Sequence, residues 1–194
     1  MMSLILASTS PFRKSLLEKL GLVFETASPD TNETPLPGES ARDLVRRLAE
    51  SKATSVAATR TRGLIIGSDQ VACLDGLIIG KPHTHEKAVQ QLESCSGKAV
   101  RFYTGLCLHE VTTGKTHSHV EVFEVLFRPL SRQQIDSYLI KEQPYQCAGS
   151  FKSEGLGICL FEKLEGRDPN SLIGLPLIAL TDLLREFGID PLTD

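Results

Sequence analysis

The chain has 194 residues, with 21 lysines and arginines against 24 aspartates and glutamates, which gives a formal net charge of −3 at pH 7. Its 41% of hydrophobic residues is ordinary for a protein with a packed core and argues against a mostly disordered chain. Because a protein that wraps a nucleic-acid backbone usually carries a basic excess, we expect no nucleic-acid partner. The length favours a single domain, and we expect one that covers residues 1–194.

The five cysteines are scattered, and no two of them have the spacing of a zinc site or of a disulfide framework. The N-terminus lacks the basic start and the long apolar stretch of a signal peptide. The most apolar segment, residues 172–184, is interrupted by Gly174, Pro176 and Asp182 and is too short to span a bilayer. We therefore expect a cytoplasmic protein with reduced thiols and no association with a membrane.

The first part of the chain alternates short β-like runs with helical ones. A helix should begin after Ser10, a typical N-cap that is followed by Pro11, and a longer helix should begin at Ser40. Asp43, three residues after Ser40, imitates a capping box. Strands are predicted for residues 4–7, 23–27 and 64–66, and a hairpin for residues 71–79 with its turn at Asp75-Gly76.

The second part continues in the same way, with a glycine-rich stretch at residues 147–157. A short turn joins two long extended runs, which we expect to pair as antiparallel strands. The predicted elements are helices at residues 84–94, 131–141 and 176–187 and strands at residues 100–108 and 119–127. The pattern predicts an α/β layered fold whose sheet is mixed and not purely parallel.

One candidate site lies where the first strand meets the first helix, in the run Ser8-Thr9-Ser10-Pro11-Phe12-Arg13-Lys14. Hydroxyls and a guanidinium beside the unpaired N–H groups of a helix N-terminus are well suited to bind phosphate. A plain N-cap with two solvated cations is the alternative, and this segment by itself favours it.

A second candidate is Asp69, which follows directly after an apolar strand in Gly67-Ser68-Asp69-Gln70. An acid at a strand end favours catalysis or metal binding, although a turn or capping aspartate is the alternative. Lys52 continues the helical spacing of the buried positions, so it is either a snorkelling lysine or a cation directed into a cleft. Lys81 has the same ambiguity, and Pro82 fixes the chain beyond it.

Together these segments resemble the Maf-like nucleotide pyrophosphatases, over nearly the whole chain. Near the end, residues 166–170 (Gly-Arg-Asp-Pro-Asn) and 174–177 (Gly-Leu-Pro-Leu) match the closing signature of that family. The family pattern, a Ser-x-x-Arg followed by single Glu, Lys, Asp and Lys residues, is matched here by Ser10, Arg13, Glu33, Lys52, Asp69 and Lys81.

The resemblance implies an elongated, mixed and twisted sheet flanked by helices, with a central cleft, similar to inosine triphosphate pyrophosphatases. It implies hydrolysis of a nucleoside triphosphate to the monophosphate and pyrophosphate with a divalent cation, Mg²⁺ or Mn²⁺, and it also allows a homodimer. Glu33 and Asp69 would hold the metal, and Asp69 would also act as the catalytic base or orient the water. Ser10, Arg13, Lys52 and Lys81 would bind the substrate.

At three further positions, the residues Phe12, Gln70 and Glu154 resemble those of the YceF-type branch of the family. The implied substrate of that branch is 7-methyl-GTP. Methylation at N7 places a positive charge on guanine, so the Phe12 ring could stack on the base. The Glu154 carboxylate could accept hydrogen bonds from guanine N1–H and the amino group. The alternatives are the same reaction on dTTP, UTP or another non-standard nucleotide, and a non-catalytic nucleotide sensor or regulator of septation.

Overall fold

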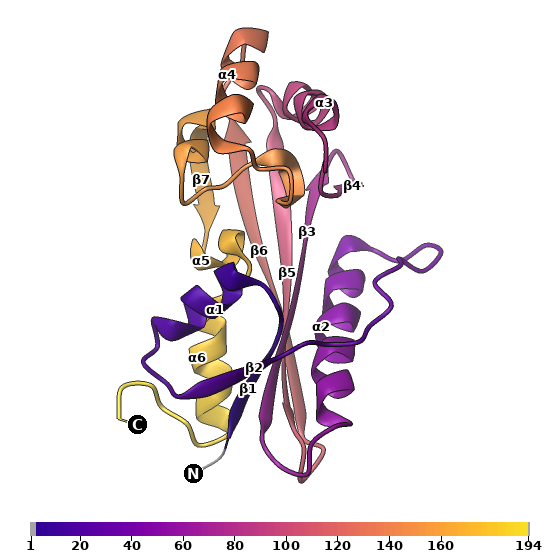
Figure 1. The fold of residues 1–194 in the computed structure, drawn as a ribbon, viewed down its shortest axis with the longest axis vertical. Coiled ribbons are helices and arrows are strands. Elements are labelled where there is room, and N and C mark those ends of the chain that lie inside the picture. The colour runs from indigo at the N-terminus through magenta and orange to yellow at the C-terminus, as the bar shows by residue number, and fades with distance from the viewer. Residues whose placement is uncertain (1–2, 194) are drawn as a thin grey trace. The chain divides into compact units, whose positions relative to one another are not determined.

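The computed structural model describes residues 3–193 (Figure 1). The strands are β1 (Leu4–Ala7), β2 (Phe24–Ala27), β3 (Leu64–Leu74), β4 (Leu77–Ile79), β5 (Ala99–Glu110), β6 (Thr116–Phe127) and β7 (Phe161–Gly166). The helices are α1 (Pro11–Glu18), α2 (Ala41–Ala57), α3 (His85–Cys95), α4 (Arg132–Glu142), α5 (Asn170–Ile173) and α6 (Leu177–Glu186), with short 3₁₀ helices η1 (Ala148–Ser150) and η2 (Leu156–Leu160).

The seven strands form one mixed sheet in the order β2-β1-β3-β5-β6-β7, with β4 paired to β3. β1 is parallel to both β2 and β3, whereas β4 is antiparallel to β3 and β7 is antiparallel to β6. The neighbours β5 and β6 are joined by a short turn in which Glu110 N donates to Lys115 O at 2.9 Å. The predicted α/β class with a mixed sheet is therefore confirmed.

The chain groups into two compact units. The first contains the residues up to Gln70, Thr104–Glu121 and the residues from Asn170 on, and the second contains Val71–Tyr103 and Val122–Pro169. Because the chain passes between the units several times, neither unit is a continuous stretch of sequence. A single domain over residues 1–194 stays a prediction.

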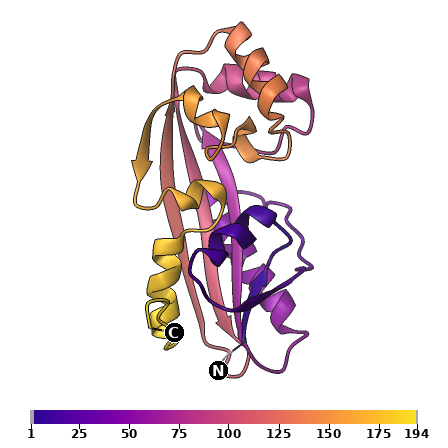
Figure 2. The same cartoon turned by 60° about the vertical axis from the view of Figure 1, so that its left-hand side comes forward.

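The first unit has three layers, with α1 and α6 on one side of its strands and α2 on the other (Figures 1 and 2). Successive side chains of a strand point to opposite faces, so each strand contributes to both layers. The α1–α6 side buries Leu4, Leu6, Leu64, Ile66, Leu106 and Leu108, and the α2 side buries Ile5, Ala7, Ile65 and Cys107.

Two glycines allow α2 to pack unusually close to the strands. A Cβ added to Gly67 of β3 would lie 2.0 Å from Ala49 O, and one added to Gly105 of β5 would lie 2.0 Å from Val45 O. Val45 and Ala49 are one helical turn apart, so the two contacts lie along the same stripe of α2. Lys52 begins the next turn of this stripe, and the glycines thereby set its distance from β3.

The second unit packs α3 and α4 near an aromatic cluster. Phe151 makes edge-to-face contacts with Phe102, Phe127 and Phe161, with ring centroids 4.8 to 5.7 Å apart. Such pairs are the favoured geometry for aromatic rings, so they help to fix the backbone around η1. Within the described part of the chain, none of the helices has the length and apolar character needed to cross a membrane.

The predicted caps are confirmed, but the predicted end of the strand at residue 66 is wrong, because β3 continues to Leu74. Asp69 therefore lies within a strand and not directly after one. Ser10 caps α1, and Ser40 Oγ accepts from Asp43 N at 3.1 Å while donating to Asp43 Oδ2 at 2.6 Å. The turn at Asp75-Gly76 has positive φ at both residues, as a two-residue hairpin turn requires. The unpredicted elements are β7, which is mostly exposed, α5, which has only four residues, and the two 3₁₀ helices η1 and η2.

Candidate functional site

The first unit brings three of the predicted site residues into direct contact. Lys52 Nζ lies 2.6 Å from Asp69 Oδ1 and 2.7 Å from Glu33 Oε1. The three side chains come from α2, from β3 and from the loop between β2 and α2. The structure therefore assembles one cation and two acids that are far apart in the sequence.

Lys52 is buried, with only 6% of its surface exposed. It follows Leu44 and Leu48 at intervals of four residues, so it lies on the buried stripe of α2, as its spacing predicts. Taking an ammonium out of water costs several kcal/mol unless it is well paired, and the two carboxylates offset this cost. The ammonium is enclosed by two carboxylates and does not reach into water, so Lys52 is not a snorkelling lysine.

The loop that carries Glu33 is fastened to α2 by Arg47. The Arg47 guanidinium donates to both Glu39 oxygens at 2.6 and 2.8 Å, and also to Thr34 O at 3.1 Å. Glu39 accepts a further hydrogen bond from Leu36 N at 2.9 Å. The hydrogen bonds from Arg47 and from the Leu36 backbone lower the pKa of Glu39 to about 2. Thr34 is the neighbour of Glu33, so this ion pair fixes the approach of Glu33 to Lys52.

Arg13 lies in the first turn of α1, whose N-cap Ser10 accepts from Arg13 N at 3.4 Å. The Arg13 Nε atom donates to Gly174 O at 2.9 Å. Burial lowers the pKa of the Arg13 guanidinium, while the negative charges of Asp69 and Glu33 act in the opposite direction. An arginine remains charged under such conditions, so its positive charge interacts with both acids of the cluster.

The side chains on either side of Asp69 point to the opposite face of β3, away from Lys52. Ser68 Oγ donates to Gly174 O at 3.0 Å. Gln70 Nε2 donates to Ser171 O at 2.5 Å and lies 3.3 Å from Leu172 O. Both neighbours of Asp69 therefore bind the backbone of residues 170–175, which we call segment 170–175.

Lys81 and Glu154, the other predicted site residues, belong to the second unit and are exposed. Burial raises the pKa of the Cys147 thiol, and the negative charge of Glu154 raises this pKa further. The positive charge of Lys81 lowers the same pKa. Both side chains therefore act on the same thiol and lie in one region of that unit. Their approach to Lys52 and Asp69 stays a prediction.

Phe12, in the first unit, is 41% exposed, as a stacking platform requires.

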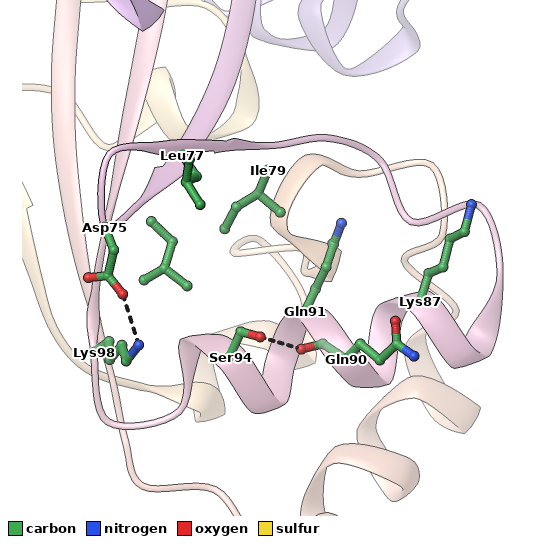
Figure 3. A pocket seen from close by; sticks show the side chains of 9 residues that line it. Asp75, Leu77, Ile79, Lys87, Gln90, Gln91, Ser94 and Lys98 are labelled. Atoms are coloured by element: carbon green, nitrogen blue, oxygen red, sulfur yellow. Dashed lines mark hydrogen bonds and ion pairs between the residues drawn. The ribbon is translucent and has the colours of Figure 1, made fainter.

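A groove of about 560 Å³ in the second unit contains none of the predicted site residues (Figure 3). It lies between the β3–β4 hairpin and α3, with Leu77 and Ile79 on one side and Lys87 on the other. Lys98 Nζ contacts Asp75 Oδ2 at 2.8 Å across one end of it. The chemistry of the candidate site is therefore separate from this groove.

The acids of the cluster fit a divalent cation that binds together with a nucleotide. Glu33 and Asp69 each direct one oxygen at Lys52 Nζ, so a cation would have to bind the second oxygen of each carboxylate. Hard cations prefer such oxygen ligands. Among the described residues, no group of three or more His, Cys, Asp or Glu side chains could hold a metal ion by itself. Mg²⁺ is commonly held by one or two carboxylates with substrate phosphates and water, so Glu33 and Asp69 would supply the protein ligands.

The comparison with known families identifies the chain. The family model described as "Maf-like protein" matches residues 3–187. The chain belongs to the Maf-like family. This confirms the family resemblance of the sequence, whose motif residues include the contacting group Glu33, Lys52 and Asp69.

Curated relatives of this Maf-like chain are similar over nearly their full length, and three of them are named "7-methyl-GTP pyrophosphatase". The protein from Nitrosococcus oceani is 59% identical over 96% of this chain and 94% of its own. Those from Pseudoalteromonas atlantica and Vibrio vulnificus are 60% and 58% identical, each over 97% of both chains. Among solved structures, a HAM1 protein from Coxiella burnetii has a TM-score of 0.46 and 18% identity, covering 66% of this chain and 73% of that one.

Sequence reasoning missed the residues that hold the site in place. Arg47 and Glu39 were overlooked because a charged pair eight residues apart is ordinary on a protein surface. Thr104 lies within β5, and no recognisable motif surrounds it. The position of Ser68 could have been predicted, because neighbouring side chains of a strand point to opposite faces and Ser68 is the neighbour of Asp69.

Proposed function

We propose that this Maf-like protein is a nucleoside triphosphate pyrophosphatase that hydrolyses 7-methyl-GTP to 7-methyl-GMP and pyrophosphate. The observation that carries the proposal is the contact of Lys52 with both Glu33 and Asp69, with the charge of Arg13 acting on the same two acids. The names of the three relatives support the same activity.

A triphosphate needs several cationic partners, and the chain offers Arg13 and Lys52 in the first unit and Lys81 in the second. An arginine fork suits phosphate oxygens, and lysine is a compact point charge. Ser10 and the N-terminus of α1 add a hydroxyl and backbone N–H groups. These groups would bind the polyphosphate and orient the α-phosphorus toward Asp69.

Asp69 is the proposed catalytic residue. Its Oδ1 is fixed by Lys52 Nζ at 2.6 Å, which leaves Oδ2 to accept a hydrogen bond from water. The water oxygen forms a bond to the α-phosphorus, and its proton passes to the Asp69 carboxylate. The bond between the α-phosphorus and the bridging oxygen breaks, and pyrophosphate leaves with the electron pair.

Glu33 and Asp69 would hold Mg²⁺ or Mn²⁺ with oxygens of the substrate. When bound, such a cation would neutralise charge that develops on the phosphate oxygens. The exposed carboxylate of Glu33, with 62% of its side chain accessible, leaves room for both Lys52 and a cation. The proposal that Glu33 and Asp69 bind a cation rests on the preference of divalent cations for carboxylate oxygens.

Recognition of the methylated base is assigned to Phe12 and Glu154. The exposed ring of Phe12 could stack on a cationic base, and the exposed carboxylate of Glu154 could accept from the guanine edge. The amide nitrogen of Gln70 is already bound to backbone carbonyls, so only its oxygen remains for the base.

The proposal is tested by measuring pyrophosphate release from a panel of nucleotides with Mg²⁺ or Mn²⁺. We expect 7-methyl-GTP to give the highest kcat/KM among 7-methyl-GTP, GTP, dTTP and UTP. A preference for dTTP or UTP would move the chain to the other proposed substrate class. Binding of nucleotides with no release of pyrophosphate would instead favour a nucleotide sensor or regulator of septation. A homodimer and a cytoplasmic location stay predictions.

A further inference from the structure

The Gly174 carbonyl holds two of the side chains around the site at once. It accepts from Arg13 Nε at 2.9 Å and from Ser68 Oγ at 3.0 Å. The Arg13 guanidinium carries five N–H donors, and this contact uses the one on Nε. The two Nη groups are left for phosphate oxygens, so the direction of the Gly174 carbonyl determines where they point.

The conformation of Gly174 depends on a single turn of helix. Gly174 N lies 3.2 Å from Asn170 O and 3.1 Å from Ser171 O, which closes the turn of α5. Gly174 has a φ of +124°, and a Cβ at this position would lie 3.3 Å from Arg13 Nε. Only glycine adopts this backbone conformation readily while allowing the guanidinium so near.

The same turn is fixed from the strands by Thr104 and Gln70. Thr104 Oγ1 donates to Ser171 O at 3.0 Å and accepts from Gln70 Nε2 at 3.1 Å. Gln70 Nε2 is also close to the carbonyls of Ser171 and Leu172, at 2.5 and 3.3 Å. Because these carbonyls can only accept, the amide nitrogen and not the amide oxygen must face them. Its two hydrogens are thus shared among three acceptors.

We infer that Thr104 is a positioning residue for the Arg13 guanidinium and that Gln70 assists it, both acting through segment 170–175. The contacts run from the Thr104 hydroxyl to the Ser171 carbonyl, through one helical turn to Gly174, and from the Gly174 carbonyl to Arg13. Thr104 is fully buried, so its hydroxyl has no contact with solvent. The inference rests on the proposed function in assigning Arg13 to the phosphates of the substrate.

The positioning is tested first without any substrate, by following the Nε–H signal of Arg13 by NMR. The signal is assigned by its disappearance in Arg13→Lys. In the wild type we expect it to exchange slowly with solvent, because the Nε–H is hydrogen-bonded to Gly174. Thr104→Val keeps the shape of the side chain but removes the hydroxyl, and it should accelerate the exchange. Thr104→Ser restores the hydroxyl and should restore slow exchange.

The consequence for binding is tested with inorganic tripolyphosphate as the probe, by calorimetry. Thr104→Val should weaken binding about tenfold, as expected for the loss of one or two hydrogen bonds, and Thr104→Ser should bind like the wild type. In an Arg13→Lys background there is no Nε to position, so adding Thr104→Val should change the affinity less than about twofold. Ile65→Val, a buried change on the opposite face of β3, controls for a general loss of stability.

The inference is overturned if Thr104→Val leaves the Arg13 Nε–H exchange unchanged, or if it weakens tripolyphosphate binding equally in both backgrounds. It is also overturned if Ile65→Val reproduces both effects, since the role of Thr104 would then be merely structural. The proposed function fails separately, if the wild type releases no pyrophosphate from any nucleotide of the panel. The two failures are distinct because the exchange measurement requires neither a nucleotide nor turnover.

Discussion

The backbones of Gly67 and Ala49 approach so closely that a Cβ on Gly67 would lie 2.0 Å from the Ala49 carbonyl oxygen. Gly67→Ala must therefore push α2 away from β3. We expect the free energy of unfolding to fall by about 3 kcal/mol, at the upper end for overpacking, as measured by urea denaturation. Gly80→Ala is the matched control, because no atom lies within 4 Å of an added Cβ there. Equal stability of the two variants would contradict the close packing.

Lys52→Met should destabilise the fold because it leaves Asp69 without its counter-charge in a buried site. We expect a loss of about 3 kcal/mol in the free energy of unfolding, the cost of an uncompensated buried charge. The double variant Lys52→Met/Asp69→Asn should recover part of this loss, since both members of the pair are then neutral. Lys98→Met, which breaks an exposed pair with Asp75, should have a much smaller effect on the free energy of unfolding, because solvent screens exposed ion pairs. If the loss of stability in the double variant equalled the sum of the losses in the two single variants, the contact between Lys52 and Asp69 would contribute no free energy.

Asp69→Asn should abolish most of the turnover while nucleotide affinity is retained. An amide cannot accept the proton of the attacking water, so we expect kcat to fall by about 10²- to 10⁴-fold. Pyrophosphate release and calorimetric binding of the nucleotide measure the two quantities separately. Asp75→Asn, at an exposed aspartate in the second unit, is the control and should keep full activity. Substantial turnover in Asp69→Asn would exclude a role for this residue as the base.

The Glu39–Arg47 pair predicts a dependence of stability on pH. The pKa of Glu39 is lowered from about 4.5 to about 2, so its stabilising effect is complete above pH 4.5 and is lost as the pH falls toward 2. Glu39→Gln should therefore be less stable than the wild type at pH 6, and the difference should shrink as the pH falls from 4.5. Urea denaturation at several pH values measures it. Glu18→Gln, in an exposed pair with Lys14 at 3.8 Å, should show little difference at pH 6.

Phe12→Arg and Glu154→Gln should lower kcat/KM for 7-methyl-GTP more than for dTTP or UTP. An arginine at position 12 would repel the cationic base, and a glutamine at position 154 removes the negative charge that balances it. Steady-state kinetics on both substrate types gives the comparison. Equal losses on the methylated purine and on the pyrimidines would show that these residues do not select the base.

Much of the fold could be predicted from local patterns. The strand at residues 4–7, the Ser10 cap and the buried stripe through Leu48 and Lys52 each follow from spacing and capping chemistry within a few residues. The short helix α5 could not be predicted, because four residues show no helical period. β7 was missed because only its first residue is buried, so it lacks the alternation of a half-buried strand.

The motif predicted a set of site residues, of which the structure brings Glu33, Lys52 and Asp69 into contact, but it did not predict how they are held. The contact of Lys52 with Glu33 joins a helix to an irregular loop, and nothing local determines where that loop passes. The hydrogen bond between Arg13 and Gly174 spans 161 positions of sequence. Such contacts depend on the tertiary arrangement, so only the structure shows that the residues after Gly166 support the first helix of the chain.

The two faces of β3 make the candidate site sensitive to strand register. Asp69 meets Lys52 on one face, while Ser68 and Gln70 bind segment 170–175 on the other. Inserting or deleting one residue just before Ser68 would exchange the two sets, turning the carboxylate toward backbone carbonyls and an amide toward the buried ammonium. Insertions and deletions of a single residue in β3 are thus far more damaging than substitutions. Only an insertion or deletion of two residues returns each side chain to the face of the sheet on which it lies in the wild type.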